Sequence, residues 1–124
     1  MPEEVCISIP ELHPSINVWT RWHFFKANIE KQRWKEMIGW LSKGIPPIKG
    51  PVEVEVVYYF PTKARKDIDN FSFKFGMDGL VAGGLIEDDN STIVTKLSTV
   101  FKYDKLNPRT EVYIKKVNQN LSTE

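Results

Sequence analysis

The sequence has a single cysteine and no long apolar run, and each shortage excludes a class of protein. One cysteine among 124 residues, Cys6, cannot form an internal disulfide, which fits a reducing compartment such as the cytoplasm. No apolar segment approaches the roughly 18 residues that span a bilayer. The first ten residues have no basic segment followed by an apolar one, so no signal peptide is expected. We therefore expect a cytoplasmic globular protein without membrane contact, in which Cys6 is a small buried side chain.

Net charge is also small, at +1, but it is unevenly distributed along the chain. Residues 21–66 carry ten bases and four acids, whereas residues 67–89 carry six acids and one base. A basic flank beside an acidic segment favours nucleic-acid binding in which divalent cations neutralise the acids. Mixed charges that only solvate the surface are the simpler alternative.

Hydrophobic periodicity predicts a single small α+β domain, with elements in the order β-α-β-α-β-β and a mixed or antiparallel sheet. The expected strands cover 5–9, 52–60, 93–103 and 109–117, and the expected helices cover 24–41 and 71–82. The last two strands are expected to form a hairpin. The segment 13–20 is expected to be a loop and 62–69 an extended connection. We assign residues 1–117 to the domain and 118–124 to a polar C-terminal tail.

Asp67 and Asp69 are separated by one residue, and Glu87, Asp88 and Asp89 follow the second predicted helix. In an extended chain, side chains two apart face the same way, with Cα atoms about 6.5–7 Å apart. Two carboxylates this close repel each other unless a divalent cation lies between them, and Mg²⁺ prefers carboxylate oxygens. If the helix brings Asp89 back to the first pair, the three could form a site that activates water at a phosphodiester.

Lys74 is the one base inside this acidic segment, where it could stabilise negative charge on the phosphate or the leaving oxygen. Structural roles remain open for the same residues. Asp69 or Asn70 could cap the second helix, and residues 88–90 could form a polar turn. Lys74 could pair with Asp78 at i, i+4.

In this order and spacing, the motifs resemble those of the RusA family of Holliday junction resolvases. The resemblance rests on Asp67-Ile68-Asp69-Asn70, on Lys74, on Asp78-Gly79-Leu80, on Gly83-Gly84-Leu85-Ile86-Glu87-Asp88-Asp89 and on Pro14-Ser15-Ile16-Asn17. It spans about residues 10–100. Lys74 lies one residue further from the first motif than the family pattern has it.

The resemblance implies a RusA-like, homodimeric endonuclease that resolves four-way DNA junctions by paired symmetrical nicks in recombination and repair. It implies catalytic roles for Asp67, Asp69, Asp89 and Lys74. The implied cofactor is Mg²⁺ or Mn²⁺, held by the same three aspartates together with Asp88.

Several side chains are then candidates for contact with DNA phosphates. Those beside the acidic motif are Lys63, Arg65 and Lys66, with Asn17 from the N-terminal motif. Four more that could extend the surface are Lys26, Lys31, Arg33 and Lys35. Phe71, Phe73 and Phe75 are expected in the core or at a dimer contact, although one of them could be an exposed wedge for the junction centre.

Two other functions stay open. A catalytically inactive junction-binding module would use the acids only to shape its surface. A protein-interaction domain would use the tryptophans and phenylalanines. His13 and His23 follow no ligand pattern, so no catalytic role is predicted for either.

Overall fold

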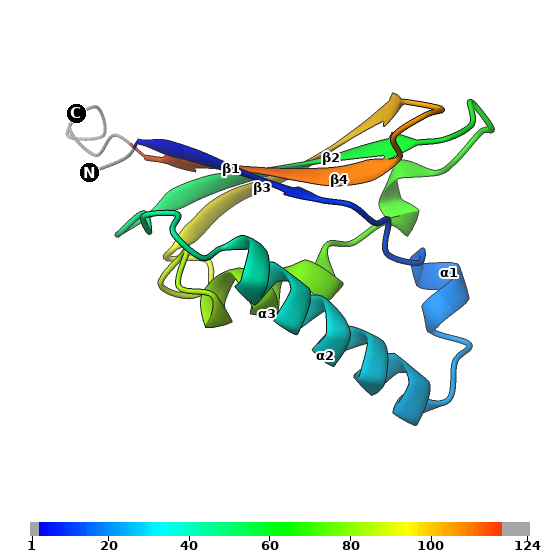
Figure 1. Cartoon of the computed structure of the whole chain (residues 1–124), viewed down its shortest axis with the longest axis horizontal. Coiled ribbons are helices and arrows are strands. Elements are labelled where there is room, and N and C mark those ends of the chain that lie inside the picture. The colour runs from blue at the N-terminus through cyan, green and yellow to red at the C-terminus, as the bar shows by residue number, and fades with distance from the viewer. Residues whose placement is uncertain (1–2, 118–124) are drawn as a thin grey trace.

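The computed structural model describes residues 3–117, which form a four-stranded sheet with the long helices on one face (Figure 1). The strands are β1 (Glu4–Ile9), β2 (Val52–Phe60), β3 (Val94–Tyr103) and β4 (Arg109–Lys116). The helices are α1 (Ile16–Trp19), α2 (Phe24–Leu41) and α3 (Lys74–Ala82), with a short 3-10 turn, η1 (Ile68–Asn70). The expected α+β order is confirmed, with α1 and η1 as additions. The predicted tail at 118–124 lies outside the described residues.

The sheet is mixed, and its last two strands in sequence are not neighbours. The spatial order is β1-β4-β2-β3, with β4 antiparallel to both β1 and β2, and β3 parallel to β2. The predicted β3–β4 hairpin is therefore wrong. Helix α3 carries the chain back to the start of β2, so the next strand runs parallel to it. β4 buries Thr110, Val112 and Ile114, which requires a central position, whereas β3 has no fully buried residue.

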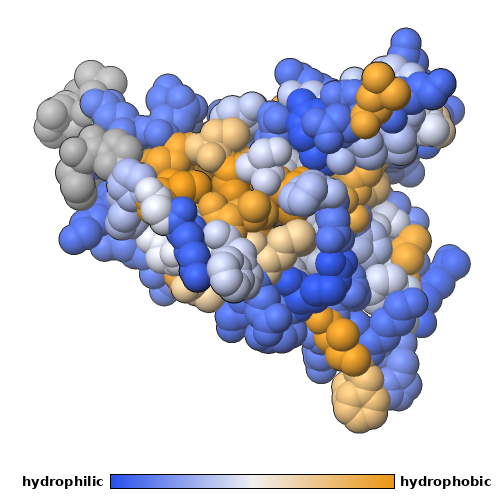
Figure 2. Space-filling model, viewed as in Figure 1, coloured by the Kyte–Doolittle hydropathy of each residue, from blue (hydrophilic) through white to orange (hydrophobic). Residues whose placement is uncertain are grey.

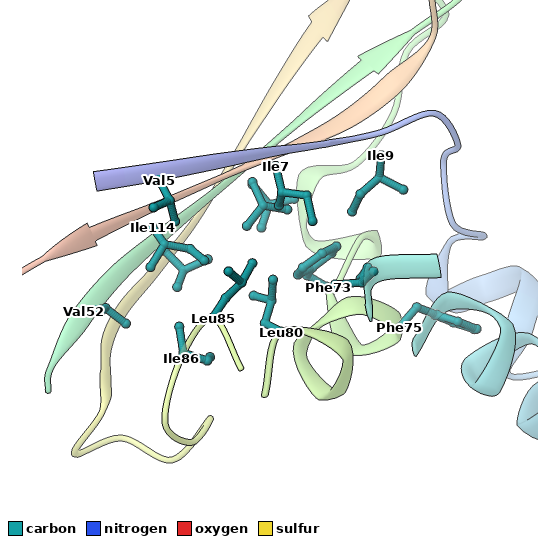
Figure 3. Packing of buried hydrophobic residues seen from close by; sticks show 14 of the residues in the cluster. Val5, Ile7, Ile9, Val52, Phe73, Phe75, Leu80, Leu85, Ile86 and Ile114 are labelled. Carbon is teal, nitrogen blue, oxygen red and sulfur yellow. The ribbon is translucent and has the colours of Figure 1, made fainter. Parts of the chain in front are cut away.

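The core lies between the sheet and helices α2 and α3. On β2, Val52, Val54 and Val56 are buried while the intervening glutamates face solvent, as the alternation predicts. The helix expected at 24–41 is also confirmed, and Trp34 and Ile38 on one side of it are fully buried. Figure 3 shows side chains from β1, β2, α3 and the segment after α3 meeting in this layer.

The three phenylalanines before and within α3 belong to this core. Phe73 and Phe75 are buried, and the half-buried Phe71 packs its ring 5.2 Å from Phe60 and 5.3 Å from Phe101. Residues two apart can all be buried because α3 begins at Lys74 rather than at residue 71. None of the three is exposed as a wedge.

Cys6 is exposed, contrary to the prediction of a buried side chain. Its neighbours Val5, Ile7 and Ile9 face the helices, so strand alternation turns Cys6 to the opposite face. That face of the sheet carries no helix (Figure 1), and Cys6 lies there opposite Tyr113 of β4.

Candidate metal site and nucleic-acid interface

The acidic motif at residues 67–70 follows the end of β2 and contacts the N-terminal motif. The backbone N–H of Asn17 donates to Asn70 Oδ1 at 3.0 Å, which joins segments 53 residues apart. Asn70 therefore does not cap α3, whose N-cap is Phe73. An open hollow at this contact is lined by Ser15, Arg65, Lys66, Asp67, Asn70 and Phe71.

Asp67 and Asp69 lie on either side of the start of a tight turn. Asp67 is extended, and the turn that follows is closed by the Asn70 N–H, which donates to the Asp67 carbonyl at 3.1 Å. The prediction that extended chain continues to residue 69 is wrong. Both carboxylates are exposed, and within residues 3–117 neither makes an ion pair. Exposed carboxylates without a protein cation are suitable ligands for Mg²⁺ or Mn²⁺.

Asp88 and Asp89 lie at the opposite end of the sheet. The preceding residue, Glu87, accepts the Gly50 N–H at 3.0 Å through Oε1, so this acidic turn is beside the start of β2. Asp88 Oδ1 in turn accepts the Asp89 N–H at 2.7 Å, as in a polar turn. β2 has nine residues, and at a rise of about 3.3 Å per residue its two ends are roughly 25 Å apart. The two acidic pairs are therefore separated by about the length of this strand.

One chain therefore does not bring all the candidate ligands together. Across the described part of the chain, no three acidic, histidine or cysteine side chains form a group that could hold a metal ion. Asp67 and Asp69 remain adjacent at one end, and Asp88 and Asp89 at the other. The donor chemistry of both pairs fits a hard divalent cation, but each pair alone has fewer ligands than were predicted.

Lys74 is the first residue of α3 and is exposed. It makes no ion pair with Asp78 in the described region. It follows η1 by four residues, so α3 begins close in the chain to Asp67 and Asp69.

The basic residues before the motif are not neutralised by acids. Lys63 and Arg65 are exposed, and Lys66 is half-buried with its Nζ donating to the Ala64 carbonyl at 2.9 Å. The Lys66 Nζ lies 4.4 Å from the centre of the Phe60 ring. None of the three forms an ion pair among residues 3–117, so their charge is available to phosphates.

Arg33 differs from these residues, because its guanidinium group is already bound. It donates to both Glu11 carboxylate oxygens at 2.7 Å and pairs with Glu30 at 2.9 Å. This ion pair joins α2 to the segment after β1. Arg33 is therefore a poor candidate for the DNA contact that the sequence suggested.

An exposed apolar surface at the start of α2 was not predicted. Phe24 and Phe25 are both exposed, with ring centres 4.3 Å apart, and Ile29 is exposed one turn later. Apolar surface is visible at this end of the molecule, at the lower right of Figure 2. Helical periodicity does not indicate this surface, because it accounts only for the side of α2 that faces the core.

His13 is a second feature that sequence reasoning missed. It is 2% exposed, and its Nε2 lies 2.6 Å from the Tyr58 hydroxyl. Its Nδ1 lies 2.8 Å from the Pro14 carbonyl, which can only accept, so Nδ1 carries the proton and Nε2 accepts from Tyr58. The pair ties the start of the N-terminal motif to β2. A loop without periodicity gives no sequence signal for such a contact.

Protonation of His13 should destabilise the fold. Burial lowers the pKa of His13 below its ordinary value of 6.5, so the unfolded chain binds more protons near and below that pH. The free energy of unfolding should therefore decrease as pH falls through 6.5, and urea titrations between pH 5 and 8 measure it. A free energy of unfolding that stays constant between pH 5 and 8 would contradict this prediction.

Tyr58→Phe tests the same contact at one pH. It leaves a buried histidine nitrogen without its donor, which should cost about 1–3 kcal/mol at pH 7. Tyr103→Phe, at a partly exposed ring on β3, is the matched control. Equal stability of the two variants would contradict the role given to the His13–Tyr58 hydrogen bond.

A comparison with protein-family models gives a match, which covers most of the chain. A family model described as Endodeoxyribonuclease RusA matches residues 12–115, most of the chain. The match includes every candidate site residue, from Asn17 to Asp89. No curated protein matches the sequence. Among the described residues, none of the helices has the length and apolar character needed to cross a membrane.

Proposed function

Because the chain belongs to the RusA family of endodeoxyribonucleases, we propose that it is a divalent-metal-dependent nuclease that resolves four-way DNA junctions. It would introduce paired symmetrical nicks during DNA recombination and repair. The observation that best supports this proposal is the contact between the two motifs. The hollow beside the Asn17–Asn70 hydrogen bond is lined by one exposed carboxylate, Asp67, and by Arg65 and Lys66, which make no ion pair among residues 3–117.

Asp67 and Asp69 are the proposed ligands at this end of the sheet, with Asp89 and Asp88 completing the set. A Mg²⁺ or Mn²⁺ ion held by these residues would activate water and stabilise charge on the phosphodiester. Their exposure leaves the carboxylate oxygens free to meet a metal ion and a phosphate together. Because one chain separates the two pairs, the proposed nuclease acts as a homodimer, which also matches the two-fold symmetry of a four-way junction.

The basic residues have separate proposed roles. Lys74, just after η1, would stabilise negative charge on the phosphate or the leaving oxygen. Lys63, Arg65 and Lys66 would bind phosphates beside the cleavage site. Asn17 would stabilise the hollow through the hydrogen bond from its backbone N–H to Asn70. None of these steps requires an aromatic wedge from the segment 71–75.

An inactive junction-binding module is the second candidate. It is favoured by one observation, that no three-ligand group forms within residues 3–117 of a single chain. Such a module would bind junctions under all metal conditions without cutting them. Asp→Asn changes in it would only strengthen binding, because they remove repulsion between carboxylates and phosphates.

The test is a labelled synthetic four-way junction incubated with the protein in Mg²⁺, in Mn²⁺ and in EDTA. We expect symmetrical nicks in either metal, none in EDTA, and none in a linear duplex with the same arm sequences. Salt-sensitive junction binding without nicks in either metal would support the inactive module. If the protein shows no salt-sensitive binding to DNA, both functions are excluded and a protein-interaction role, using the exposed surface at Phe24 and Phe25, is favoured.

A further inference from the structure

Two aromatic rings in the first turn of α2 lie outside the core. Phe24 is 61% exposed and Phe25 is 63% exposed, although phenylalanine is among the residues most often buried. Their ring centres lie 4.3 Å apart, and the His23 ring lies against both, at 4.6 Å and 5.1 Å. Ile29, at 66% exposed, continues this surface one turn later. Phe24, Phe25 and Ile29 form the α2 platform, and Figure 1 shows the start of α2 as the part of this helix furthest from the sheet.

Positive charge surrounds the α2 platform. Residues 20–35 carry five bases and one acid. The acid, Glu30, is already paired with Arg33 at 2.9 Å. The other bases make no ion pair among residues 3–117: Arg21, Lys26, Lys31 and Lys35. The charge around the platform therefore complements a polyanion.

Two of these lysines lie over aromatic rings beside the platform. The Lys26 Nζ is 4.3 Å from the centre of the Trp22 ring, and the Lys31 Nζ is 5.1 Å from the centre of the Trp19 ring. Cations and aromatic rings thus alternate along this surface. Proteins that bind single-stranded nucleic acid combine the same two groups, since cations contact the phosphates and rings stack on the bases.

The α2 platform follows closely on the candidate site along the chain. The helix before it, α1, is held to the acidic motif by the hydrogen bond from the Asn17 N–H to Asn70. The last residue of α1, Trp19, packs its ring 5.7 Å from that of Phe75 in α3. Phe24 is five residues beyond Trp19, a span of at most about 18 Å. One DNA strand covers that distance with about five nucleotides.

We infer that the α2 platform binds unpaired nucleotides of the DNA substrate, with bases stacked on Phe24 and Phe25. Phosphates of the same strand are bound by Arg21, Lys26 and Lys31. This inference rests on the proposed function and identifies a second DNA contact for it. The occupant is a strand near the crossover, where bases that have left the duplex stack expose their faces.

The shape of the surface favours bases over a protein helix. An amphipathic helix binds through apolar anchors repeated over several turns. The apolar positions on α2 end after one turn, because Phe25 and Ile29 are followed on the same side by Gln32 and Glu36. A shallow hollow beside the rings is lined by Phe25, Asn28, Ile29, Gln32, Arg33 and Glu36. The amides of Asn28 and Gln32 provide both donors and acceptors, which suit the edges of bases.

The platform is also too small for a contact between two copies. Its three side chains expose on the order of 300–400 Å². A stable protein pair buries about 800 Å² on each partner. Stacking of two or three bases needs only the exposed ring faces.

Binding of a labelled single-stranded oligothymidylate of about twelve nucleotides tests the inference by fluorescence anisotropy. The titration is done in EDTA, so it does not depend on cleavage. In the variant that combines Phe24→Ala and Phe25→Ala, the Kd should increase about tenfold for each ring removed. Its thermal unfolding should match that of the wild type, because both side chains are exposed. Equal affinity of the wild type and this variant would overturn the inference.

Two further double variants separate stacking from simple apolar contact. Phe24→Tyr with Phe25→Tyr keeps both rings and should bind the oligothymidylate like the wild type. Phe24→Leu with Phe25→Leu keeps the surface apolar without rings and should bind as weakly as the alanine variant. Wild-type affinity in the leucine variant would contradict stacking.

Trp40→Ala is the matched control for position. Trp40 is a 69% exposed ring on the same helix, with the Lys43 Nζ 3.8 Å from its centre. It lies about 24 Å along α2 from Phe24, so its loss should leave the affinity unchanged. A loss of affinity in Trp40→Ala equal to that of the alanine double variant would mean that binding is not located at the platform.

The outcomes separate this inference from the proposed function. Junction cleavage by the wild type, with equal oligothymidylate affinity in the alanine double variant, would overturn the inference alone. Oligothymidylate binding through Phe24 and Phe25 without junction cleavage would overturn the nuclease proposal alone. A shift to a smaller particle in light scattering of the alanine double variant, with its DNA affinity unchanged, would instead identify the platform as a protein contact.

Discussion

Asp69→Asn is expected to abolish cleavage of a four-way junction while leaving binding of the junction intact. The substitution keeps the size of the side chain but removes a negative oxygen ligand. A metal ion contributes several kcal/mol of charge stabilisation at such a site, and every 1.4 kcal/mol is a factor of ten in rate. The rate should therefore fall by a factor on the order of 10³. Because Asp69 is exposed, the fold should not change.

Two measurements separate loss of chemistry from loss of binding. Single-turnover cleavage rates give the first, and gel-shift titration in Ca²⁺ or EDTA gives the second. Binding should be equal or slightly tighter, because one charge that repels phosphate is gone. Glu53→Gln, at an exposed acid on β2, is the control and should cut like the wild type. Full cleavage by the Asp69→Asn protein would remove the chemistry assigned to the motif.

Replacing Lys63, Arg65 and Lys66 together by alanine should weaken binding to the junction by a factor on the order of 100 at low salt. These side chains make no ion pairs among residues 3–117, so their positive charge is not already used within the fold. Each phosphate contact contributes about 0.9 to the slope of log K against log salt concentration. The slope should therefore decrease by about 2.7.

Arg33→Ala is the matched control for that experiment. Its guanidinium is held by Glu11 and Glu30, so its loss should leave both the affinity and the slope unchanged. The single variant Arg65→Ala should reduce the slope by about 0.9. An unchanged slope in the triple variant would mean that DNA does not approach this end of the sheet.

The parts of the fold that depend on local periodicity were predictable from the sequence. The alternating valines and glutamates of β2 and the apolar stripe of α2 fix which side of each element faces the core. The separation of β3 from β4, which do not pair, was not predictable in the same way. A short connection suggested a hairpin, but the burial of β4 on one face and the edge position of β3 are decided by contacts between distant segments.

The candidate site was also predictable only where it depends on residues close together in the chain. Asp67 and Asp69 are two residues apart, so their proximity follows from the sequence alone. The position of Asp89 depends on the direction of β3. Because β3 is parallel to β2, the chain must return to the start of β2 before entering it, so residues just before β3 lie far from residues just after β2. No local pattern of residues determines that direction.

Contacts between loops were the least predictable. The bond from Asn17 to Asn70 and the buried His13–Tyr58 pair join residues with no shared periodicity. Asn70 satisfies the sequence rule for a helix cap, but its side chain is used by the N-terminal motif instead.

The central proposal is that Asp67, Asp69 and Asp89, brought together in the proposed homodimer, hold a divalent ion. Anomalous diffraction from crystals soaked in Mn²⁺ measures this directly. The account predicts a peak at each of two equivalent sites, within coordination distance of these three carboxylates from two chains. A Mn²⁺ peak held by other residues in a protein that cuts junctions, or three ligands from one chain, would contradict it.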